Sequence, residues 1–336
     1  KAGVERKERG RRMSDGDRLL VFTGSSNPEL TKEVCTYIGV KEAQITISKF
    51  ADGEIHLKSE ENVRGKEVFV IQSTNPPAEN IIELLIMIDA LRRASAEKIT
   101  VIIPYYGYAR QDRKTQAREP ITAKLLANLI TTAGASRVIN IDLHAGQIQG
   151  FFDIPSDNLT ASSFFAQYIK NKNLGNVVVV SPDVGGVNRA KQFGTLLGAG
   201  LAICSKNREE KDKVDSITLI GDVKDKCAIL IDDIISTGGT LVKASEEVKN
   251  KGAKKIYACA THGLFAGESL EIINNSPIDE VLVTNSVKID KEKLEKCKKI
   301  KVISIAQLIG EAILRVSTRR SLSELFYDFQ KISLFD

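Results

Sequence analysis

Short apolar runs alternate with longer amphipathic segments along almost the whole chain, and this alternation limits the possible fold more than any other feature. Residues 177–181 read VVVVS, and residues 68–72 and 228–232 are also nearly all apolar. Strands that are buried on both faces have this composition. Between the runs, residues 79–94 and 240–251 carry apolar side chains at helical spacing. The pattern predicts an α/β fold, in which parallel sheets are covered by helices on both faces.

Strands are expected at residues 19–23, 68–72, 100–103, 137–141, 177–181, 228–232, 255–260, 280–284 and 301–304. The strand–helix–strand pattern of residues 68–105 recurs at 228–261, which favours two similar domains, and a length of 336 residues fits that number. We expect a basic N-terminal extension (1–17), an N-terminal domain (18–160) and a C-terminal domain (161–310). A boundary is expected near residues 158–162. A second linker is expected near Ile309, followed by a helix at 311–316 that completes the first domain.

The net charge of +5 is concentrated at the beginning of the chain. Six basic and two acidic residues fall within residues 1–12, so the rest of the chain carries only +1. Nucleic-acid binding is therefore not expected. Residues 1–17 lack the apolar centre of a secretory signal, and Glu5 and Glu8 favour a solvated extension over a transit peptide. No apolar run approaches the roughly 18–20 residues of a membrane span.

Five cysteines occur at wide spacing with no CxxC pair. An odd count without a metal or redox motif predicts free thiols in a reduced intracellular protein. Residues 206–215 read KNREEKDKVD, a charged stretch without periodicity, which predicts a mobile loop.

The strongest chemical motif is residues 229–240, which read ILIDDIISTGGT. An apolar strand ends at Asp232 and Asp233, and a glycine-rich turn then opens a helix. Glycines let backbone N–H groups converge on a phosphate, which the start of a helix also attracts. The two carboxylates would repel a phosphate, so they suit sugar hydroxyls or a metal. The alternative is an ordinary strand followed by a capped helix.

Two further strand ends carry polar clusters. Residues 142–157 read DLHAGQIQGFFDIPSD, and a histidine near several carboxylates can bind a hard divalent cation and phosphate, although a structural histidine is an equal alternative. Residues 181–191 read SPDVGGVNRAK and place Asp183 before a glycine pair and a helix bearing Arg189 and Lys191. A plain glycine turn is the alternative there.

The loop at residues 105–118 reads YYGYARQDRKTQAR and is both basic and aromatic. Arginine can stack on adenine or pair with phosphate, although an RNA-contacting loop is also compatible with this composition. No Walker A sequence occurs, so any use of ATP does not depend on a P-loop.

Together, these segments resemble the ribose-phosphate pyrophosphokinases, also called phosphoribosyl pyrophosphate (PRPP) synthetases, over about residues 19–326. The resemblance includes FADGEIH (50–56), VRGKEVFVIQST (63–74), ELLIMIDALRRASA (83–96) and GDVKDKCAILIDDI (221–234). It implies type I phosphoribosyltransferase-like domains and an enzyme of nucleotide biosynthesis that uses Mg²⁺. The implied reaction transfers the β,γ-diphosphoryl group of ATP to the C1 hydroxyl of ribose 5-phosphate, giving PRPP and AMP.

The resemblance also implies roles for individual residues. ATP would be held by Phe50, Asp52, Glu54, Arg110 and Gln111, the first three supplied by a neighbouring subunit. Magnesium would be held by His144 and Asp183, with Asp142, Asp153 and Asp157 as weaker candidates. Ribose 5-phosphate would be held by Asp232, Asp233, Ser236, Thr237, Gly238, Gly239 and Thr240. Lys206 and Arg208 match a catalytic Lys-x-Arg, and cations on a closing loop suit phosphoryl transfer.

A regulatory site for phosphate and ADP is implied at Arg64, Ser95, Ser321, Ser323 and Phe326, with inorganic phosphate as activator. The expected protein is a cytoplasmic homo-oligomer, a hexamer built from dimers, that binds neither nucleic acid nor membrane. Three positions depart from the family pattern. Ser236 replaces an acid, Asn62 replaces a regulatory-site serine, and Ser156 replaces an apolar residue without any functional explanation.

Two alternatives remain from the sequence. A noncatalytic synthetase-associated subunit would carry insertions or lose site residues, but the site residues named above are present and no long insertion is seen. A phosphoribosyltransferase that consumes PRPP would share the glycine-rich loop. The N-terminal segments FADGEIH and YARQDRK argue against it.

Overall fold

The computed structural model describes residues 19–207, 216–323 and 325. These residues form two compact units. Unit 1 contains the described residues up to Leu159 together with those from Ala306 onward, and unit 2 contains those of Thr160–Ile305. Unit 2 is therefore inserted in the sequence between two segments of unit 1.

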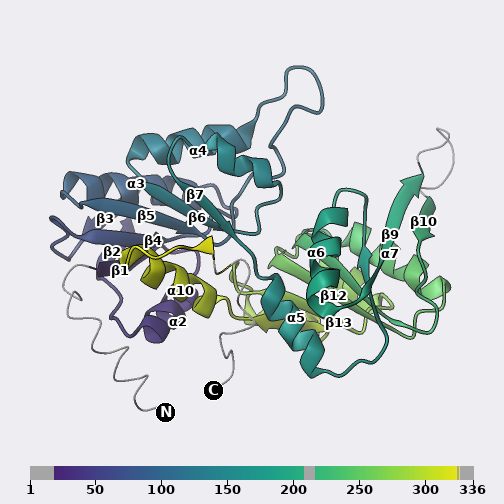
Figure 1. Ribbon diagram of the computed structural model, residues 1–336. Coiled ribbons are helices and arrows are strands. Elements are labelled where there is room, and N and C mark those ends of the chain that lie inside the picture. Colours follow the sequence, from purple (N-terminus) through teal and green to yellow (C-terminus); the bar gives the residue numbers. More distant parts are fainter. Residues whose placement is uncertain (1–18, 208–215, 324, 326–336) are drawn as a thin grey trace, which may run out of the picture. The chain divides into compact units, whose positions relative to one another are not determined.

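Unit 1 is built on a five-stranded parallel sheet in the order β1-β4-β5-β6-β7. Its strands are β1 (Leu19–Thr23), β4 (Glu67–Ile71), β5 (Lys98–Ile103), β6 (Arg137–Ile141) and β7 (Ser156–Leu159). Helices α3 (Glu79–Arg93) and α4 (Thr122–Ala133) cover one face, and α2 (Pro28–Ile38) and α10 (Ala306–Ser317) cover the other (Figure 1). The apolar strands are buried between these two helical layers, as the composition predicted.

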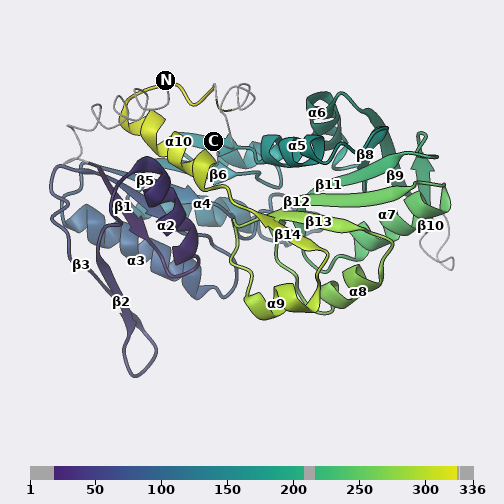
Figure 2. The ribbon, with the colours of Figure 1, turned by 90° about the horizontal axis from the view of Figure 1, so that it is seen from below.

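A separate antiparallel hairpin, β2 (Ile45–Lys49) with β3 (Ile55–Ser59), projects from unit 1 (Figure 2). Ile45 and Leu57 pack against the unit 1 core and anchor the hairpin. Both strands alternate apolar and polar residues, as half-exposed strands do. These two strands are not among the nine that the sequence predicts.

Unit 2 contains a seven-stranded sheet in the order β10-β9-β8-β11-β12-β13-β14, in which only the β9–β10 pair is antiparallel among the described strands. The strands are β8 (Val177–Ser181), β9 (Gly200–Asn207), β10 (Ser216–Ile220), β11 (Cys227–Ile235), β12 (Lys255–Gly263), β13 (Glu280–Thr284) and β14 (Ile300–Ile303). Helices α5 (Ser162–Asn171) and α6 (Val187–Leu197) lie on one face. Helices α7 (Gly239–Asn250), α8 (Ser269–Asn275) and α9 (Lys291–Lys296) lie on the other (Figure 2).

The strand order of unit 2 reverses at one place. From β8 the chain passes through α6 to β9 on one side, whereas β11 pairs with β8 on the other side and leads through α7 to β12. The loops that follow β8 and β11 therefore diverge. Ligands of open α/β sheets bind in the crevice beyond the strand ends at such a switch point.

The predicted α/β fold is confirmed, and each of the nine predicted strands is found, with boundaries shifted by three residues at most. The sequence missed β2, β3, β7, β9 and β10. The linker expected near Ile309 is wrong, because α10 begins at Ala306 and buries Ile309. The loop expected from residue 206 begins later, because β9 continues to Asn207.

All five cysteines are free, as expected, and all five are buried. Burial raises the pKa of the Cys35 and Cys204 thiols to about 12 and that of Cys227 to about 11. In the part of the chain that the structure describes, every helix is too short or too polar to cross a lipid bilayer.

Candidate active site

The acidic pair of unit 2 lies at the carboxyl end of β11, beside the switch point. Asp232 is half-buried and Asp233 is only 2% exposed. The backbone N–H of Asp233 donates to Oδ1 of Asp232 at 2.9 Å. Consecutive side chains of a strand normally point to opposite faces of the sheet. The bond from Asp233 N–H turns the Asp232 carboxylate back toward Asp233, so the two carboxylates can share partners. They offer several acceptor oxygens at one strand end.

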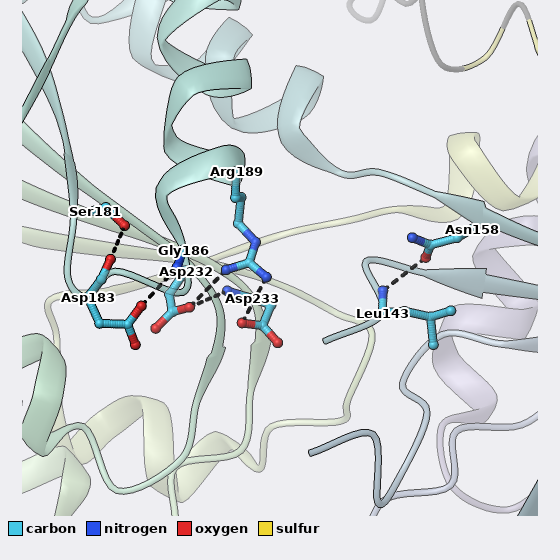
Figure 3. A network of polar contacts seen from close by, with 8 residues as sticks. All are labelled: Leu143, Asn158, Ser181, Asp183, Gly186, Arg189, Asp232 and Asp233. Atoms are coloured by element: carbon cyan, nitrogen blue, oxygen red, sulfur yellow. Dashed lines mark hydrogen bonds and ion pairs between the residues drawn. The ribbon is translucent and has the colours of Figure 1, made fainter. Parts of the chain in front are cut away.

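Arg189, in the first turn of α6, bridges both carboxylates (Figure 3). Its Nη1 lies 3.0 Å from Oδ1 of Asp232, and its Nη2 lies 3.0 Å from Oδ1 of Asp233. Burial, followed by the nearby charge of Asp233, raises the pKa of Asp232 to about 7, while Arg189 acts in the opposite direction. The sequence analysis noted Arg189 on this helix but assigned it no partner.

The glycine-rich turn after the acidic pair leads directly into α7. Gly238 has φ 78° and precedes the helix, and no side chain caps the helix start. The carbonyl of Ser236 accepts from Ala266 N–H at 3.0 Å, which fixes the base of the turn. Thr237 is exposed. A helix start without a side-chain cap presents N–H groups to an anion.

Asp183 follows β8 on the other side of the switch point. Its Oδ1 accepts from Gly186 N–H at 2.8 Å, and its carbonyl accepts from Ser181 Oγ at 2.6 Å (Figure 3). These two bonds hold the turn that leads into α6. The predicted ribose-binding residues and Asp183 therefore lie at the ends of two neighbouring strands of one sheet.

In unit 1, Asp142 and His144 follow the carboxyl end of β6. Asp142 adopts φ 43°, and its N–H donates to the Leu159 carbonyl at 2.8 Å. Leu143 N–H donates to Oδ1 of Asn158 at 2.9 Å (Figure 3). The loop is thus tied to β7, and the His144 side chain is exposed.

The other acids of this motif lie apart from each other. Asp157 is within β7 and forms an ion pair with Arg137 at the start of β6, toward the opposite end of the strand from Asp142. Asp153 is largely exposed, with Lys124 Nζ at 3.8 Å. Among the described residues, no three His, Cys, Asp or Glu side chains cluster to hold a metal. The four predicted metal residues of unit 1, Asp142, His144, Asp153 and Asp157, are therefore not one preformed cage.

The basic aromatic loop after β5 is held firmly at its base. Gly107 N–H donates to Thr74 Oγ1 at 2.7 Å, and a Cβ at Gly107 would lie 2.1 Å from the Thr74 carbonyl oxygen, so this contact requires glycine. Gln111 Oε1 accepts from Thr122 Oγ1 at 2.5 Å. Arg110, one residue earlier, is exposed. The two predicted ATP residues of this loop are therefore adjacent to a rigid anchor.

A buried polar network behind this loop escaped the sequence analysis. Glu83, only 5% exposed, accepts from Ser25 N–H at 2.6 Å, from Ser25 Oγ at 2.7 Å and from Gln72 Nε2 at 2.8 Å. Nearby, Ser73 Oγ accepts from Tyr105 N–H at 3.2 Å. The network joins the ends of β1 and β4 to the start of the basic loop. No local pattern signals these contacts, because they join residues up to 58 positions apart.

The three remaining predicted ATP residues lie at the tip of the β2–β3 hairpin. The tip is ordered by its own bonds, from Phe50 N–H to the Glu54 carbonyl and from Glu54 N–H to Oδ1 of Asp52. Phe50 is 55% exposed, with its ring 5.1 Å from that of His56. An ordered hairpin tip with an exposed phenyl ring suits a contact with a flat ligand.

The predicted regulatory residues fall into two groups in unit 1. Arg64 and Ser95 belong to adjoining turns, joined by Gly65 N–H donating to the Ser95 carbonyl at 2.9 Å. Ser321 and Ser323 line a pocket of about 560 Å³ at the amino ends of β4 to β6. The other lining residues are Glu67, Lys98, Thr100, Ser136, Arg137, Pro155, Asp157, Val316, Arg319, Arg320 and Leu322. Arg64 and Ser95 are not among them.

Three predicted residues lie wholly or partly outside the described part of the chain. The backbone of Lys206 is in β9, but Arg208 and Phe326 lie outside the described residues.

The chain was compared with known proteins. A family model described as the N-terminal domain of ribose phosphate pyrophosphokinase matches residues 19–134, and one described as a phosphoribosyl synthetase-associated domain matches 209–327. The ribose-phosphate pyrophosphokinase of Bacillus subtilis is 50% identical over 313 residues, 93% of this chain and 98% of its own length. That of Thermotoga maritima is 51% identical over 318 residues, 94% of this chain and all of its own length.

The chain belongs to the ribose-phosphate pyrophosphokinase family. A crystal structure of phosphoribosylpyrophosphate synthetase from Mycobacterium smegmatis agrees, with 41% identity and a TM-score of 0.85 over 90% of this chain and 99% of that one. The family resemblance inferred from the sequence is therefore confirmed. The match extends through both units, so the strand-end clusters described above belong to a shared architecture.

Proposed function

We propose that this protein is a ribose-phosphate diphosphokinase. The C1 hydroxyl oxygen of ribose 5-phosphate attacks the β-phosphorus of ATP, a new O–P bond forms, and the bond between the α,β-bridging oxygen and the β-phosphorus breaks. AMP leaves with that oxygen, the hydroxyl proton is released, and PRPP is the second product.

One observation carries the proposal. At the switch point of unit 2, a paired acid and an uncapped, glycine-rich helix start follow the same strand, in a chain half identical to ribose-phosphate pyrophosphokinases. A sugar phosphate has hydroxyls that suit carboxylate acceptors and a phosphate that suits backbone N–H donors. Asp232 and Asp233 would receive the ribose hydroxyls, and residues 236–240 would receive the 5-phosphate.

Unit 1 would bind ATP. Arg110 and Gln111 follow the anchored turn at Gly107, and their position next to an exposed tyrosine, Tyr108, supports nucleotide contact. Phe50, Asp52 and Glu54 would reach the ATP of a neighbouring subunit from the exposed hairpin tip. Unit 1 would therefore bind ATP, and unit 2 would bind ribose 5-phosphate.

Magnesium would be held by Asp183 and His144, with phosphate oxygens of ATP as further ligands. The donor set fits this ion, because Mg²⁺ in nucleotide sites keeps waters and uses one or two carboxylates rather than an all-protein cage. Asp142 would support the loop of His144. The contacts of Asp153 and Asp157 with cations argue against them as ligands. When bound, the ion would neutralise phosphate charge.

Lys206 and Arg208 would neutralise the charge that develops on the transferred group. Lys206→Ala combined with Arg208→Ala should lower turnover at least about 100-fold while leaving ATP binding nearly intact. Turnover and calorimetric ATP binding are measured side by side. Lys211→Ala with Lys213→Ala removes two cations from the same charged stretch and serves as the control. Near-normal turnover in the first double variant would reject the assignment.

Regulation and assembly complete the proposal. Ser321, Ser323 and Phe326, with Arg64 and Ser95, would bind phosphate as activator and ADP as inhibitor, and the cationic lining of the 560 Å³ pocket supports an anion there. Asn62 accepts from Arg64 N–H at 3.2 Å, a bond that a shorter serine would make differently. We further propose a cytoplasmic hexamer built from dimers, in which the exposed hairpin tip would contact the ATP of a neighbouring subunit.

The test is an assay of the purified protein with ATP, Mg²⁺, inorganic phosphate and ribose 5-phosphate, in which AMP and PRPP are quantified together. The two products should form in equal amounts. AMP without PRPP would indicate ATP hydrolysis. No AMP from a folded sample that binds ATP would favour the noncatalytic associated subunit, and Ser236→Asp would then be the first variant to assay.

A further inference from the structure

Arg189 bridges the two acids of unit 2. It comes from α6, 43 residues before Asp232, and its two terminal nitrogens each lie 3.0 Å from one carboxylate (Figure 3). Its side chain is only 23% exposed. A planar guanidinium that contacts two groups at once fixes their relative orientation, which a flexible ammonium cannot do.

The acidic pair needs such a partner. Two adjacent carboxylates repel each other, and the Asp233 side chain is 3% exposed, so water screens its charge poorly. A buried carboxylate is retained as an anion only when a nearby cation and hydrogen bonds compensate for its lost hydration. Arg189 supplies both to the same pair.

Arg189 also joins α6 to β11 beside the switch point. Its helix starts immediately after the turn that Asp183 holds through Gly186 N–H, whereas its partners end β11. α6 follows β8, whereas the acidic pair lies near the end of β11, so the contacts between them limit how far the acidic pair can rotate. The guanidinium of Arg189 thus holds the two acidic side chains from the side of α6.

We propose that Arg189 is a positioning residue for ribose 5-phosphate. It acts through Asp232 and Asp233, holding the two side chains aligned to accept the ribose hydroxyls, and does not itself contact the sugar. This inference rests on the proposed function of the same site.

The experiment compares Arg189→Met and Arg189→Lys with wild type. The readouts are kcat, the KM values for ribose 5-phosphate and ATP, and the selectivity for ribose 5-phosphate over 2-deoxyribose 5-phosphate. Selectivity is the ratio of the two kcat/KM values. Where the analogue turns over too slowly, selectivity is the ratio of its inhibition constant to the KM for ribose 5-phosphate. Lys191→Met removes an exposed cation from the same helix and serves as the control.

In Arg189→Met, the KM for ribose 5-phosphate should rise at least about tenfold, the KM for ATP should stay within about twofold, and selectivity should fall at least about tenfold. Arg189→Lys keeps the positive charge but lacks the planar guanidinium that contacts both carboxylates. Its KM for ribose 5-phosphate and its selectivity should lie between those of Arg189→Met and wild type. Lys191→Met should match wild type.

Selectivity is a ratio, so a partly unfolded sample does not distort it. If Arg189→Met fails to fold, the KM and selectivity of Arg189→Lys test the proposal instead. A lower kcat with unchanged KM values and selectivity would mean that Arg189 only stabilises the local structure, and this result would overturn the proposal. A rise confined to the KM for ATP would also overturn it. A wild-type protein that forms no PRPP would instead reject the proposed function.

Discussion

Asp232→Asn should stabilise the protein at neutral and alkaline pH. The pKa of Asp232 is raised from 3.8 to about 7, first by burial and then by Asp233. Between these values the folded state binds more protons than the unfolded state, so stability falls as pH rises through this range. A displacement of about three pKa units corresponds to about 4 kcal/mol lost by pH 8.

This cost already includes the attraction of Arg189. The asparagine side chain avoids it but places an amide among groups that accommodate a carboxyl, which offsets about 1–3 kcal/mol. The expected net gain is about 1–3 kcal/mol at pH 8, or about 2–10 °C in the melting temperature of a domain of this size. Between pH 8 and pH 5 the advantage should shrink by about 2–3 kcal/mol, because wild-type Asp232 becomes protonated in the folded state.

The measurement is urea unfolding of wild type and Asp232→Asn at pH 5, 6, 7 and 8. Asp225→Asn is the matched control, because its carboxylate side chain is 68% exposed and pairs with Lys254 only at 3.5 Å. A free-energy difference between Asp232→Asn and wild type that is the same at all four pH values would refute the reasoning. So would a net loss of stability at pH 8. Ribose 5-phosphate affinity should fall in the same variant, so stability and function would change in opposite directions.

Three other predictions concern residues away from the acidic pair. Glu83→Gln places an amide donor among three hydrogen-bond donors and should lower the free energy of unfolding of unit 1 by about 2–3 kcal/mol. Denaturant unfolding measures this loss, with Glu79→Gln on the same helix as the control. An equal loss in both variants would contradict the network. Gly107→Ala should raise the KM for ATP at least about tenfold through the clash with the preceding loop while leaving that for ribose 5-phosphate unchanged, and normal kinetics would show that the turn adapts. The thiols of Cys35 and Cys204, with pKa values of about 12, should react with a thiol reagent at pH 8 at least about 100-fold more slowly in the native than in the urea-unfolded protein; rapid labelling of the native chain would contradict their burial.

The fold was predictable where burial dictates composition. A strand such as β8 is covered on both faces, so four consecutive valines mark it without ambiguity. The missed strands lack this signal. β7 is one of two edge strands of unit 1, and it reads SDNL because three of its four residues are only partly buried. β2 and β3 alternate because one face of each is exposed. A search for period-two alternation around the turn at residues 50–54 would have found the hairpin.

The candidate site was predictable only in its local parts. Asp232, Asp233 and the glycine-rich turn lie together in the sequence, as do the strand and helix that present them. The partner of the acidic pair was not predictable, because Arg189 reaches it from another helix across the switch point. The hydrogen-bond network of Glu83 was not predictable either, because its partners are far apart in the sequence. Glu83 itself lies on a helix face that is otherwise apolar.

The insertion of unit 2 between two segments of unit 1 has a consequence for synthesis. α10 packs on α2, and Tyr37 Oη donates to Oε1 of Glu311 at 2.7 Å, so a contact that completes unit 1 joins residues 274 positions apart. Translation delivers residues at about 5–20 per second, so α2 leaves the ribosome at least about 14 seconds before its helical partner exists. Unit 2, whose described strands all lie between residues 177 and 303, is complete earlier. The half that begins the chain is therefore the half that finishes folding last, and its apolar α2 face is the surface that a nascent-chain chaperone would have to shield.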